Sequence, residues 1–311
     1  MYDLIIVGGG PGGVAAGIYA ARKKIKVAIV TDSFGGQSLV SSDVQNWIGT
    51  KSISGLELAQ ALEEHLRAQD GIDIFDGDLV ATVTARSEGG FALTTRNGKT
   101  LEARFLLIVT GSRRRKLGIP GEKELDGKGV VYCSTCDAPL FKDKRVVVVG
   151  GGNAGLEAVI DSLPYASEVY LLEFKDQLKG DPVTQEKVKA SSKVQVILQA
   201  QALQVLGDKF VSGLKYKDLK TNEEKTLAVD GIFVEIGAVP NSDLVKGLVE
   251  LNQINEIIAD PRTQRTSNPG IWAVGDVSDV LYKQNNISVG DAIKAVLSIY
   301  DQIHKGERAA M

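Results

Sequence analysis

The 311-residue sequence predicts an α/β protein with two similar units, because one strand–glycine–helix pattern occurs twice and strand and helix patterns alternate around it. The first copy, YDLIIVGGGPGGVAAGIYAA, begins at Tyr2, and the second, KRVVVVGGGNAGLEAVIDSL, begins at Lys144. Each copy is an apolar run of strand length, then glycines, then an Ala-rich helical pattern. Such alternation is typical of parallel sheets covered by helices.

Both copies place the spacing Gly-x-Gly-x-x-Gly between strand and helix. The glycines are Gly8, Gly10 and Gly13 in the first copy and Gly150, Gly152 and Gly155 in the second. In a dinucleotide-binding unit the first glycine permits a tight turn, the second lets backbone N–H groups approach a pyrophosphate, and the third packs the helix against the strand. One match alone could be a turn that binds nothing. Two matches in the same context predict two Rossmann-like, three-layer domains, each with a dinucleotide site.

The remaining elements are predicted in chain order. Outside the second unit we expect a loop at FGGQ (34–37), a helix near 56–69, alternating segments at 91–95 and 101–104, a buried strand FLLIVTG ending at Gly111, the segment GIWAVGD (270–276) and a final helix near 290–304. The second unit contains the predicted strands EVYLLEF, VQVILQAQ, FVSGLKYKD and GIFVEIG. We predict that this unit, 115–244, is inserted in the first, which comprises 1–114 and 245–311.

Composition narrows the class of protein. The formal net charge is −3 and the pI is about 5.6, which argues against nucleic acid as the main partner, because a phosphate-binding surface needs an excess of Lys and Arg. No apolar run approaches the roughly 18–20 residues of a membrane helix. The N-terminus carries Asp3 and runs straight into glycines, unlike a signal peptide. We therefore expect a cytoplasmic protein with no membrane partner.

The two cysteines, Cys133 and Cys136, form a Cys-x-x-Cys pair in VVYCSTCDAPLF. Such a pair can bind zinc, staple a loop or carry electrons as a disulfide. Structural zinc needs about four Cys or His ligands, and the only histidines, His65 and His304, are distant in the sequence. Structural disulfides are rare in the cytoplasm. A redox pair is therefore favoured and no metal is expected.

Several motifs together resemble one family. The segments YCSTCDAPLFKDKRVVVVGGGNAGLEAVIDS, VYLLEFKDQLKGD, FVEIGAVPN and YKQNNISVG carry the likeness over nearly the whole chain. The chain resembles the low-molecular-weight thioredoxin reductases, and it is more similar still to the reductase portion of the alkyl hydroperoxide reductase flavoprotein subunit. The resemblance implies that the outer unit binds FAD, that the inserted unit binds NAD(P)H and carries the Cys pair, and that the protein is a homodimer.

The resemblance also implies a set of cofactor contacts. The expected FAD contacts are Gly8, Gly10, Pro11, Gly13, Gly35, Gly36, Gln37, Asn46, Gly111, Gly275, Asp276, Lys283 and Gln284. Those for the nicotinamide dinucleotide are Gly150, Gly152, Asn153 and Gly155. Relatives often end the second strand with Glu as a ligand of the adenosine ribose, but here Thr31 holds that position and Asp32 follows. Asp32 is therefore either a ribose ligand or a solvated loop acid.

The dithiol can receive electrons from a nicotinamide only through a flavin. A disulfide does not accept hydride directly, whereas a flavin accepts the hydride and passes the electron pair to sulfur. By resemblance, Cys136 lies against the flavin and Cys133 is its partner. Asp137 would handle the thiol proton as a general acid. The alternative for Asp137 is a helix cap.

The electron donor depends on the end of the second strand of the inserted unit. NADPH-using relatives carry a His-Arg-Arg-x-x-x-Arg run there, whereas this chain has Glu173, Phe174, Lys175 and Lys179. An acid at this place accepts the ribose 2′-OH of NADH and repels a 2′-phosphate, although either Lys could supply a phosphate contact. We expect NADH, with NADPH as the less favoured donor. A ferredoxin-dependent enzyme is a further alternative, but such relatives tend to lose the second glycine motif.

The partner is expected to be a separate molecule. The flavoprotein subunit that the chain resembles carries its own thioredoxin-fold segment before the FAD strand, and this chain begins at that strand. We expect electrons to pass from Cys133 and Cys136 to a thioredoxin- or glutaredoxin-like dithiol protein. Direct reduction of a peroxidase or a small disulfide is the second possibility. The basic run RRRK at 113–116 is either a solvated crossover or a rim that steers an acidic partner.

Overall fold

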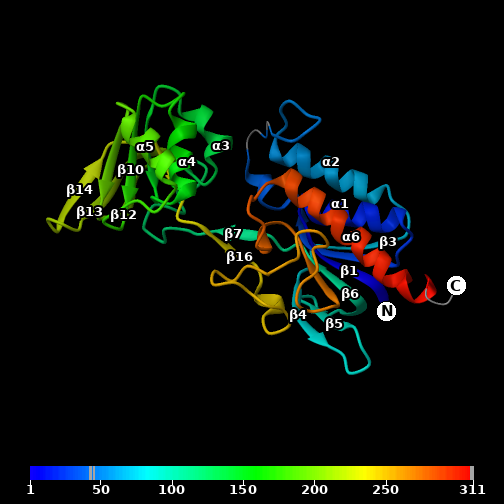
Figure 1. Cartoon of the computed structure of the whole chain (residues 1–311). Helices are drawn as coiled ribbons and strands as arrows, with labels where there is room; N and C mark the ends of the chain where they lie inside the picture. Colours follow the sequence, from blue (N-terminus) through cyan, green and yellow to red (C-terminus); the bar gives the residue numbers. More distant parts are fainter. Residues whose placement is uncertain (42–43, 45, 309–311) are drawn as a thin grey trace. The chain divides into compact units, whose positions relative to one another are not determined.

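The computed structural model describes residues 1–41, 44 and 46–308 and contains two compact units (Figure 1). The outer unit comprises Met1–Arg113 and the chain from Val239 onward, and the inserted unit comprises Arg114–Ala238. The outer unit thus resumes at Val239, whereas the inserted unit was predicted to extend to residue 244. The reason is that the short 3₁₀ helix η3 (Asp243–Val245) belongs to the outer unit, where Val245 is buried in the core.

The outer unit has a seven-stranded sheet in the order β3-β2-β1-β6-β5-β4, with β17 paired to β6. Its strands are β1 (Tyr2–Gly9), β2 (Val27–Phe34), β3 (Ile72–Asp76), β4 (Val80–Ala85), β5 (Phe91–Thr95), β6 (Thr100–Ile108) and β17 (Ile271–Ala273). Its helices are α1 (Pro11–Arg22), η1 (Gly36–Val40), α2 (Gly55–Arg67), η4 (Gly275–Val277) and α6 (Asn285–Arg308). Strands β1, β2, β3, β6 and β17 pair in parallel, and β4 and β5 are antiparallel additions.

Two apolar clusters build the outer unit into layers. Helices α1 and α6 pack on one face of the sheet with Trp272, which is fully buried. The other face packs against the antiparallel strands and the segment around Val245 and Ile257. Helix α2 begins with a capping box, in which Ser54 Oγ accepts the Glu57 N–H at 3.2 Å and the Glu57 carboxylate accepts the Ser54 N–H at 3.0 Å. This local signal fixes the start of the helix.

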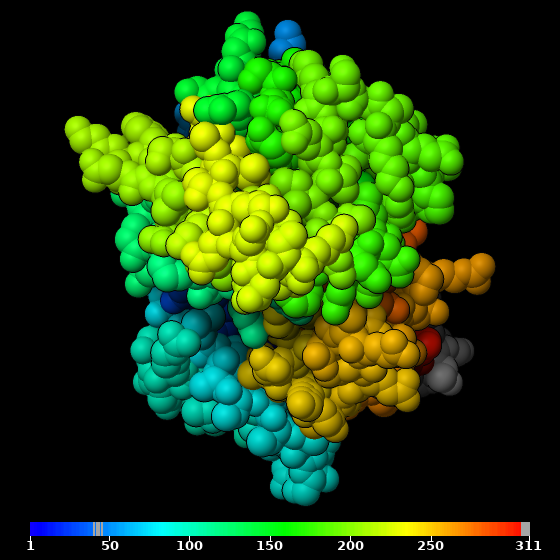
Figure 2. Space-filling model, turned by 90° about the vertical axis from the view of Figure 1, so that its left-hand side faces the viewer, coloured from blue at the N-terminus to red at the C-terminus, as the bar shows by residue number. Residues whose placement is uncertain are grey.

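The inserted unit repeats the same plan. A parallel sheet has the order β11-β10-β9-β15-β8, and a three-stranded antiparallel sheet has the order β12-β13-β14. The strands are β8 (Val130–Val131), β9 (Arg145–Val149), β10 (Glu168–Glu173), β11 (Val194–Leu198), β12 (Ala200–Gly207), β13 (Val211–Asp218), β14 (Glu223–Leu227) and β15 (Gly231–Val234). The helices are α3 (Ser134–Asp137), η2 (Ala138–Phe141), α4 (Asn153–Ser162) and α5 (Pro182–Ala190). Helices cover one face of the parallel sheet and the antiparallel sheet covers the other. The turn between β13 and β14 protrudes from this unit in both views (Figures 1 and 2).

The two crossovers of the chain pair as a short ribbon, β7 (Ser112–Arg114) with β16 (Ala238–Pro240). Three predicted elements differ from the structure. The predicted strand VQVILQAQ is two strands, β11 and β12, which belong to different sheets. The segments predicted separately at 101–104 and in FLLIVTG are one strand, β6, because the antiparallel and parallel pairings follow each other along it. Helix α6 begins at Asn285 rather than near 290, because Ser288 packs against the first glycine loop. Among the described residues, no helix is long and apolar enough to cross a membrane.

Candidate active site

The two glycine loops, at 8–13 and 150–155, have the same backbone geometry. At the first glycine of each, Gly8 and Gly150, φ is +115° and +122°, and a Cβ would overlap a backbone oxygen of the next strand segment. At the third glycine, Gly13 and Gly155, a Cβ would overlap the backbone oxygen of the first glycine. The turn and the close helix–strand packing therefore require glycine at these four positions.

The second glycine of each loop faces open space. A Cβ at Gly10 or Gly152 would meet no protein atom within 4 Å. These residues are also the N-caps of α1 and α4, and neither cap makes a side-chain hydrogen bond. The first N–H groups of both helices are thus available to an anion at the positive end of the helix. Pro11 opens α1, and Asn153 opens α4 and accepts the Asp181 N–H at 2.7 Å. Both loops fit a pyrophosphate.

Thr31 and Asp32 are neighbours near the end of β2, and their side chains differ in exposure. Thr31 is buried, and its side chain lies where a Cβ on Gly9 would be. Its hydroxyl donates to the Ser33 carbonyl at 2.6 Å. Asp32 is exposed, as expected for the next residue along a strand. The buried strand-end side chain of the first loop is therefore neutral, and the acid that follows it faces solvent.

The end of β10 carries an acid instead. The Glu173 carboxylate accepts the Gly151 N–H at 2.6 Å and the Lys175 N–H at 2.7 Å. Glu173 is half-buried and lies against the middle glycine of its loop, the same place that Thr31 occupies against Gly9. This carboxylate is thus held rigidly at the edge of the second glycine loop.

A polar cluster joins three distant segments of the outer unit. The Gln37 amide donates to Ser112 Oγ at 3.2 Å and to Asp276 Oδ2 at 3.0 Å, and the Ser112 hydroxyl donates to Asp276 Oδ2 at 3.4 Å. Ser112 was missed by the sequence reasoning, although it directly follows the predicted Gly111. Together these groups offer the donors and acceptors that a polyol chain such as ribitol requires.

A second polar contact links the loop at 46–51 to the start of α6. The Asn46 amide donates to Gln284 Oε1 at 3.2 Å, and the Asn286 amide donates to the Asn46 carbonyl at 2.7 Å. The Lys283 ammonium is held elsewhere, by Glu256 at 2.8 Å and by the Ser278 carbonyl at 2.5 Å. The four other predicted glycines of this unit have positive φ: Gly35, Gly36, Gly111 and Gly275.

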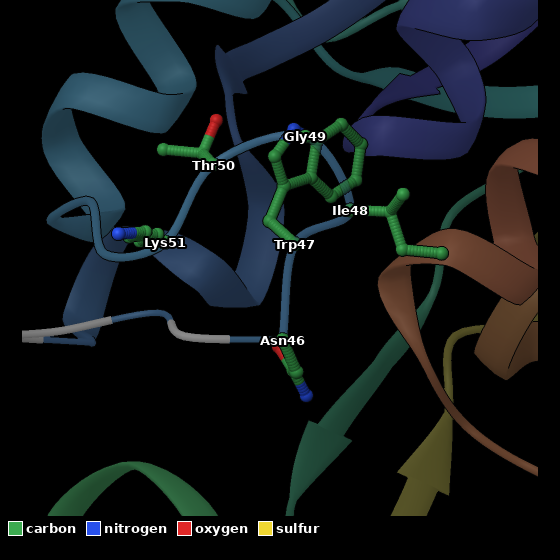
Figure 3. Close-up of a pocket in the computed structure, with 6 residues that line it drawn as sticks. All are labelled: Asn46, Trp47, Ile48, Gly49, Thr50 and Lys51. Atoms are coloured by element: carbon green, nitrogen blue, oxygen red, sulfur yellow. The ribbon is translucent and has the colours of Figure 1, made fainter.

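The loop at 46–51 lines a shallow, open pocket of about 400 Å³ (Figure 3). Trp47 is half-buried, whereas Trp272 is in the core. Ile48 is 81% exposed. In Figure 3 the side chains of Asn46 and Trp47 leave the loop in different directions. This loop therefore presents both an amide and an aromatic ring at the surface of the outer unit.

The Cys pair of the inserted unit is a disulfide, Cys133–Cys136, across the first turn of α3, with the Cα atoms 5.4 Å apart. Asp137 follows directly, and its N–H donates to the Cys133 carbonyl at 2.9 Å. Burial raises the pKa of Asp137 to about 6, although the charge of Arg114 opposes the shift. Asp137 makes no side-chain cap at the start of η2. The Asp137 carboxyl also accepts a hydrogen bond from the backbone of Cys133, the N-cap residue of α3, so its position is compatible with both expected roles, helix cap and proton donor.

Two further carboxyls, which sequence reasoning missed, surround this turn. Asp161 accepts hydrogen bonds from Ser134 Oγ at 2.8 Å and Thr135 Oγ1 at 3.2 Å. Glu235 is buried beyond the end of β15, with Arg114 Nη1 3.6 Å from its carboxylate. Burial raises the pKa of Glu235 to about 7. The only signal in the sequence was an acid in the apolar run GIFVEIG. The part of the chain that the structure describes holds no group of three or more His, Cys, Asp or Glu suited to a metal ion.

The chain belongs to the pyridine nucleotide-disulphide oxidoreductase family, whose model matches residues 2–298. It is 45% identical to the F component of alkyl hydroperoxide reductase from Pseudomonas putida and 41% identical to a protein named NADH dehydrogenase of Bacillus subtilis. Each match covers 97% of this chain but only 58% of the relative. The chain thus spans little more than half the length of these curated relatives.

Solved structures cover nearly the whole chain. The thioredoxin reductase of Streptococcus pyogenes is 32% identical, with a TM-score of 0.84, over 98% of this chain and 99% of that one. The thioredoxin reductase of T. acidophilum is 38% identical, with a TM-score of 0.71, over 97% and 98%. The predicted thioredoxin-reductase-like α/β fold and the membership of the pyridine nucleotide-disulphide oxidoreductase family are confirmed.

Proposed function

We propose that the protein is an FAD-dependent, thioredoxin-reductase-like disulfide reductase that takes electrons from NADH and delivers them through Cys133 and Cys136 to a separate dithiol protein. The observation that carries the proposal is the disulfide on the same unit as an open glycine loop. That unit can therefore hold the electron donor's dinucleotide and the first sulfur acceptor. The reaction consumes NADH and one proton and converts one disulfide into two thiols.

The outer unit would hold FAD. Its pyrophosphate would bind the first glycine loop, where Gly10 leaves room and α1 presents its N–H groups. The proposed contacts are Gly8, Gly10, Pro11, Gly13, Asp32, Gly35, Gly36, Gln37, Asn46, Gly111, Gly275, Asp276 and Gln284. The cluster of Gln37, Ser112 and Asp276 is suited to the ribitol. Because Glu256 holds the Lys283 side chain, we assign Lys283 to positioning the segment that follows it.

FAD, when bound, accepts hydride from the nicotinamide and supplies the electron pair that opens the disulfide. The remaining steps belong to the chain. Cys136 would be the flavin-facing sulfur and Cys133 its partner. Asp137, a carboxyl with a raised pKa beside the pair, would hold the proton that one sulfur receives as the bond breaks, because an acid with a pKa near the working pH is a good donor.

NADH is the proposed donor because of Glu173. Its carboxylate is fixed at the edge of the second glycine loop, where it would accept the ribose hydroxyls and repel a 2′-phosphate. Gly150, Gly152, Asn153 and Gly155 complete the proposed site. A relative 41% identical to this chain is named NADH dehydrogenase, which supports the assignment. Lys175 and Lys179 are exposed and favour NADPH as the second candidate.

The electron acceptor is proposed to be a thioredoxin- or glutaredoxin-like protein, and the enzyme to be a homodimer. The solved thioredoxin reductases match the chain over nearly its whole length, which supports an acceptor of this size and chemistry. Direct reduction of a peroxidase is the alternative, since other relatives are named as components of alkyl hydroperoxide reductase.

An anaerobic reduction experiment tests the proposal. The purified protein should be yellow, and NADH should bleach its flavin band. Turnover with NADH and a small disulfide alone should be slow and should rise strongly when a thioredoxin-like protein is added. The acceptor can be captured from lysate as a mixed disulfide with Cys133→Ser and Cys136→Ser. A protein that binds no flavin, or that captures only a large peroxidase, would contradict this assignment.

A further inference from the structure

The buried carboxyl of Glu235 has no role in the mechanism above, although it lies beside the redox turn. Its side chain is 5% exposed. Its backbone N–H donates to the Val149 carbonyl at 2.9 Å, and its carbonyl oxygen packs against Gly150. The position of this residue is therefore fixed by the sheet and by the second glycine loop, and its carboxyl cannot turn freely into solvent.

The charged groups that face Glu235 belong to elements packed around the disulfide. Arg114 of β7 lies 3.6 Å away. Asp161 and Glu157 of α4 oppose its ionisation, and a hydrogen bond from the backbone of Ser134 favours it. Ser134 directly follows Cys133, and its hydroxyl is held by Asp161. Ser134, between the two cysteines, thus contacts the carboxyls of both Glu235 and Asp161. The guanidinium of Arg114, which faces Glu235, also interacts with Asp137.

Reduction of the disulfide adds charge to this turn. A thiolate formed there would be a second negative charge beside a buried carboxylate that one partly exposed arginine compensates. Ionising two acidic groups of like charge in such a buried site costs electrostatic free energy. The burial-raised pKa of Glu235, about 7, places its titration where cysteine thiols also lose protons. The two groups should therefore titrate as a coupled pair.

We propose that Glu235 is a positioning residue that sets the acidity of the reduced dithiol, by opposing thiolate formation when it is ionised and permitting it when it is protonated. When the S–H bond breaks, its proton leaves to solvent water, and a Glu235 carboxyl that stays protonated adds no second negative charge to the turn. The role depends on the redox function proposed for the disulfide, but the thiol chemistry can be measured without NADH or a partner.

The test measures the rate of thiol alkylation by iodoacetamide against pH in the Cys136→Ser protein, which keeps the Cys133 thiol and the whole chain. The same measurement is made after adding Glu235→Gln. Because glutamine carries no charge, the rate ratio of the Gln variant to its parent should be about 1 at pH 5.5, where Glu235 is protonated. The ratio should rise to about 3- to 10-fold near pH 8, the effect of up to one pKa unit, and return toward 1 where every thiol is ionised.

Matched variants separate charge from structure. Glu157→Gln removes an exposed acid of α4 and should change the rate less than about twofold at every pH. Glu235→Asp should restore the pH dependence of the parent, and Glu235→Ala should repeat that of Gln if Gln fails to fold. A pH-independent rate ratio, or a ratio below 1 near pH 8, would overturn the proposal. Failure of NADH to bleach the flavin would instead overturn the proposed function and leave this result standing.

Discussion

Replacing Glu173 with Gln should relax the choice between NADH and NADPH. The carboxylate accepts the Gly151 and Lys175 N–H groups at 2.6 and 2.7 Å. Gln keeps the shape of the side chain and one acceptor oxygen, so that at least one of these hydrogen bonds survives. What the substitution removes is one negative charge at the edge of the second glycine loop. The expected result is a smaller ratio of kcat/KM for NADH to kcat/KM for NADPH.

The size of the effect follows from the distance and the exposure of the carboxylate. Two unit charges about 4 Å apart repel by about 1 kcal/mol in water and about 4 kcal/mol at an effective dielectric constant of about 20. Glu173 is half-buried, so a value between these limits applies, about 1.5–3 kcal/mol. Since about 1.4 kcal/mol is a tenfold change, the selectivity ratio should fall by about 10- to 100-fold, mainly through faster turnover with NADPH.

The assay is steady-state disulfide reduction with each donor, with flavin content and unfolding temperature as checks on folding. Asp176→Asn is the control, because it removes the same charge from an exposed side chain three residues away and should leave the ratio within about twofold. An equal loss of selectivity in both variants would assign the effect to net charge alone. Unchanged selectivity in the Gln variant, or a wild-type preference for NADPH, would refute the role of Glu173.

Five further variants test the rest of the site. Gly10→Ala adds a Cβ that meets no protein atom within 4 Å, so the free energy of unfolding should change by less than about 0.5 kcal/mol while FAD affinity falls. Gly13→Ala adds a Cβ that overlaps the backbone and should lower the free energy of unfolding by about 1–3 kcal/mol. Calorimetry measures the first quantity and flavin titration the second. Cys133→Ser or Cys136→Ser should retain NADH-dependent bleaching of the flavin and lose disulfide reduction, and near wild-type reduction of a thioredoxin-like protein by either variant would refute the redox assignment. Burial raises the pKa of Asp137 to about 6, and only the protonated form can donate, so disulfide reduction should fall as pH rises through that value; Asp137→Asn should abolish this dependence and slow the reaction by about 10²–10⁴-fold.

The sequence predicted those parts of the fold and site that depend on local geometry. Each glycine loop is six residues long, and its turn, its open position and its helix start are all set within it. The capping box of α2 and the apolar runs of the parallel strands are equally local signals. For this reason the two units and their strand–glycine–helix pattern could be derived before the structure was known.

The sequence could not predict contacts between residues that are far apart along the chain. Gln37 meets Asp276 across 239 positions and Ser112 across 75, and no pattern in any one segment indicates the meeting. Glu235 was likewise invisible as a neighbour of the redox turn, because only the parallel order β9-β15-β8 brings the end of β15 beside Ser134. Strand β6 was predicted as two segments for a related reason. Its first half has an alternating apolar pattern and pairs with β5, whereas its second half is continuously apolar and pairs with β1.

The two glycine loops together show how one chain can hold two dinucleotides with different demands. Their backbones match, but the strand-end side chain differs: Thr31 satisfies its own hydroxyl on Ser33, whereas Glu173 presents a carboxylate. Under the proposed assignment, the first loop binds a resident cofactor that has no 2′-phosphorylated competitor, so no charge is needed there. The second loop binds a donor that must be exchanged in every turnover while NADPH competes for the site. Discrimination by repulsion is required only at that loop, and that is where the chain carries the half-buried negative charge.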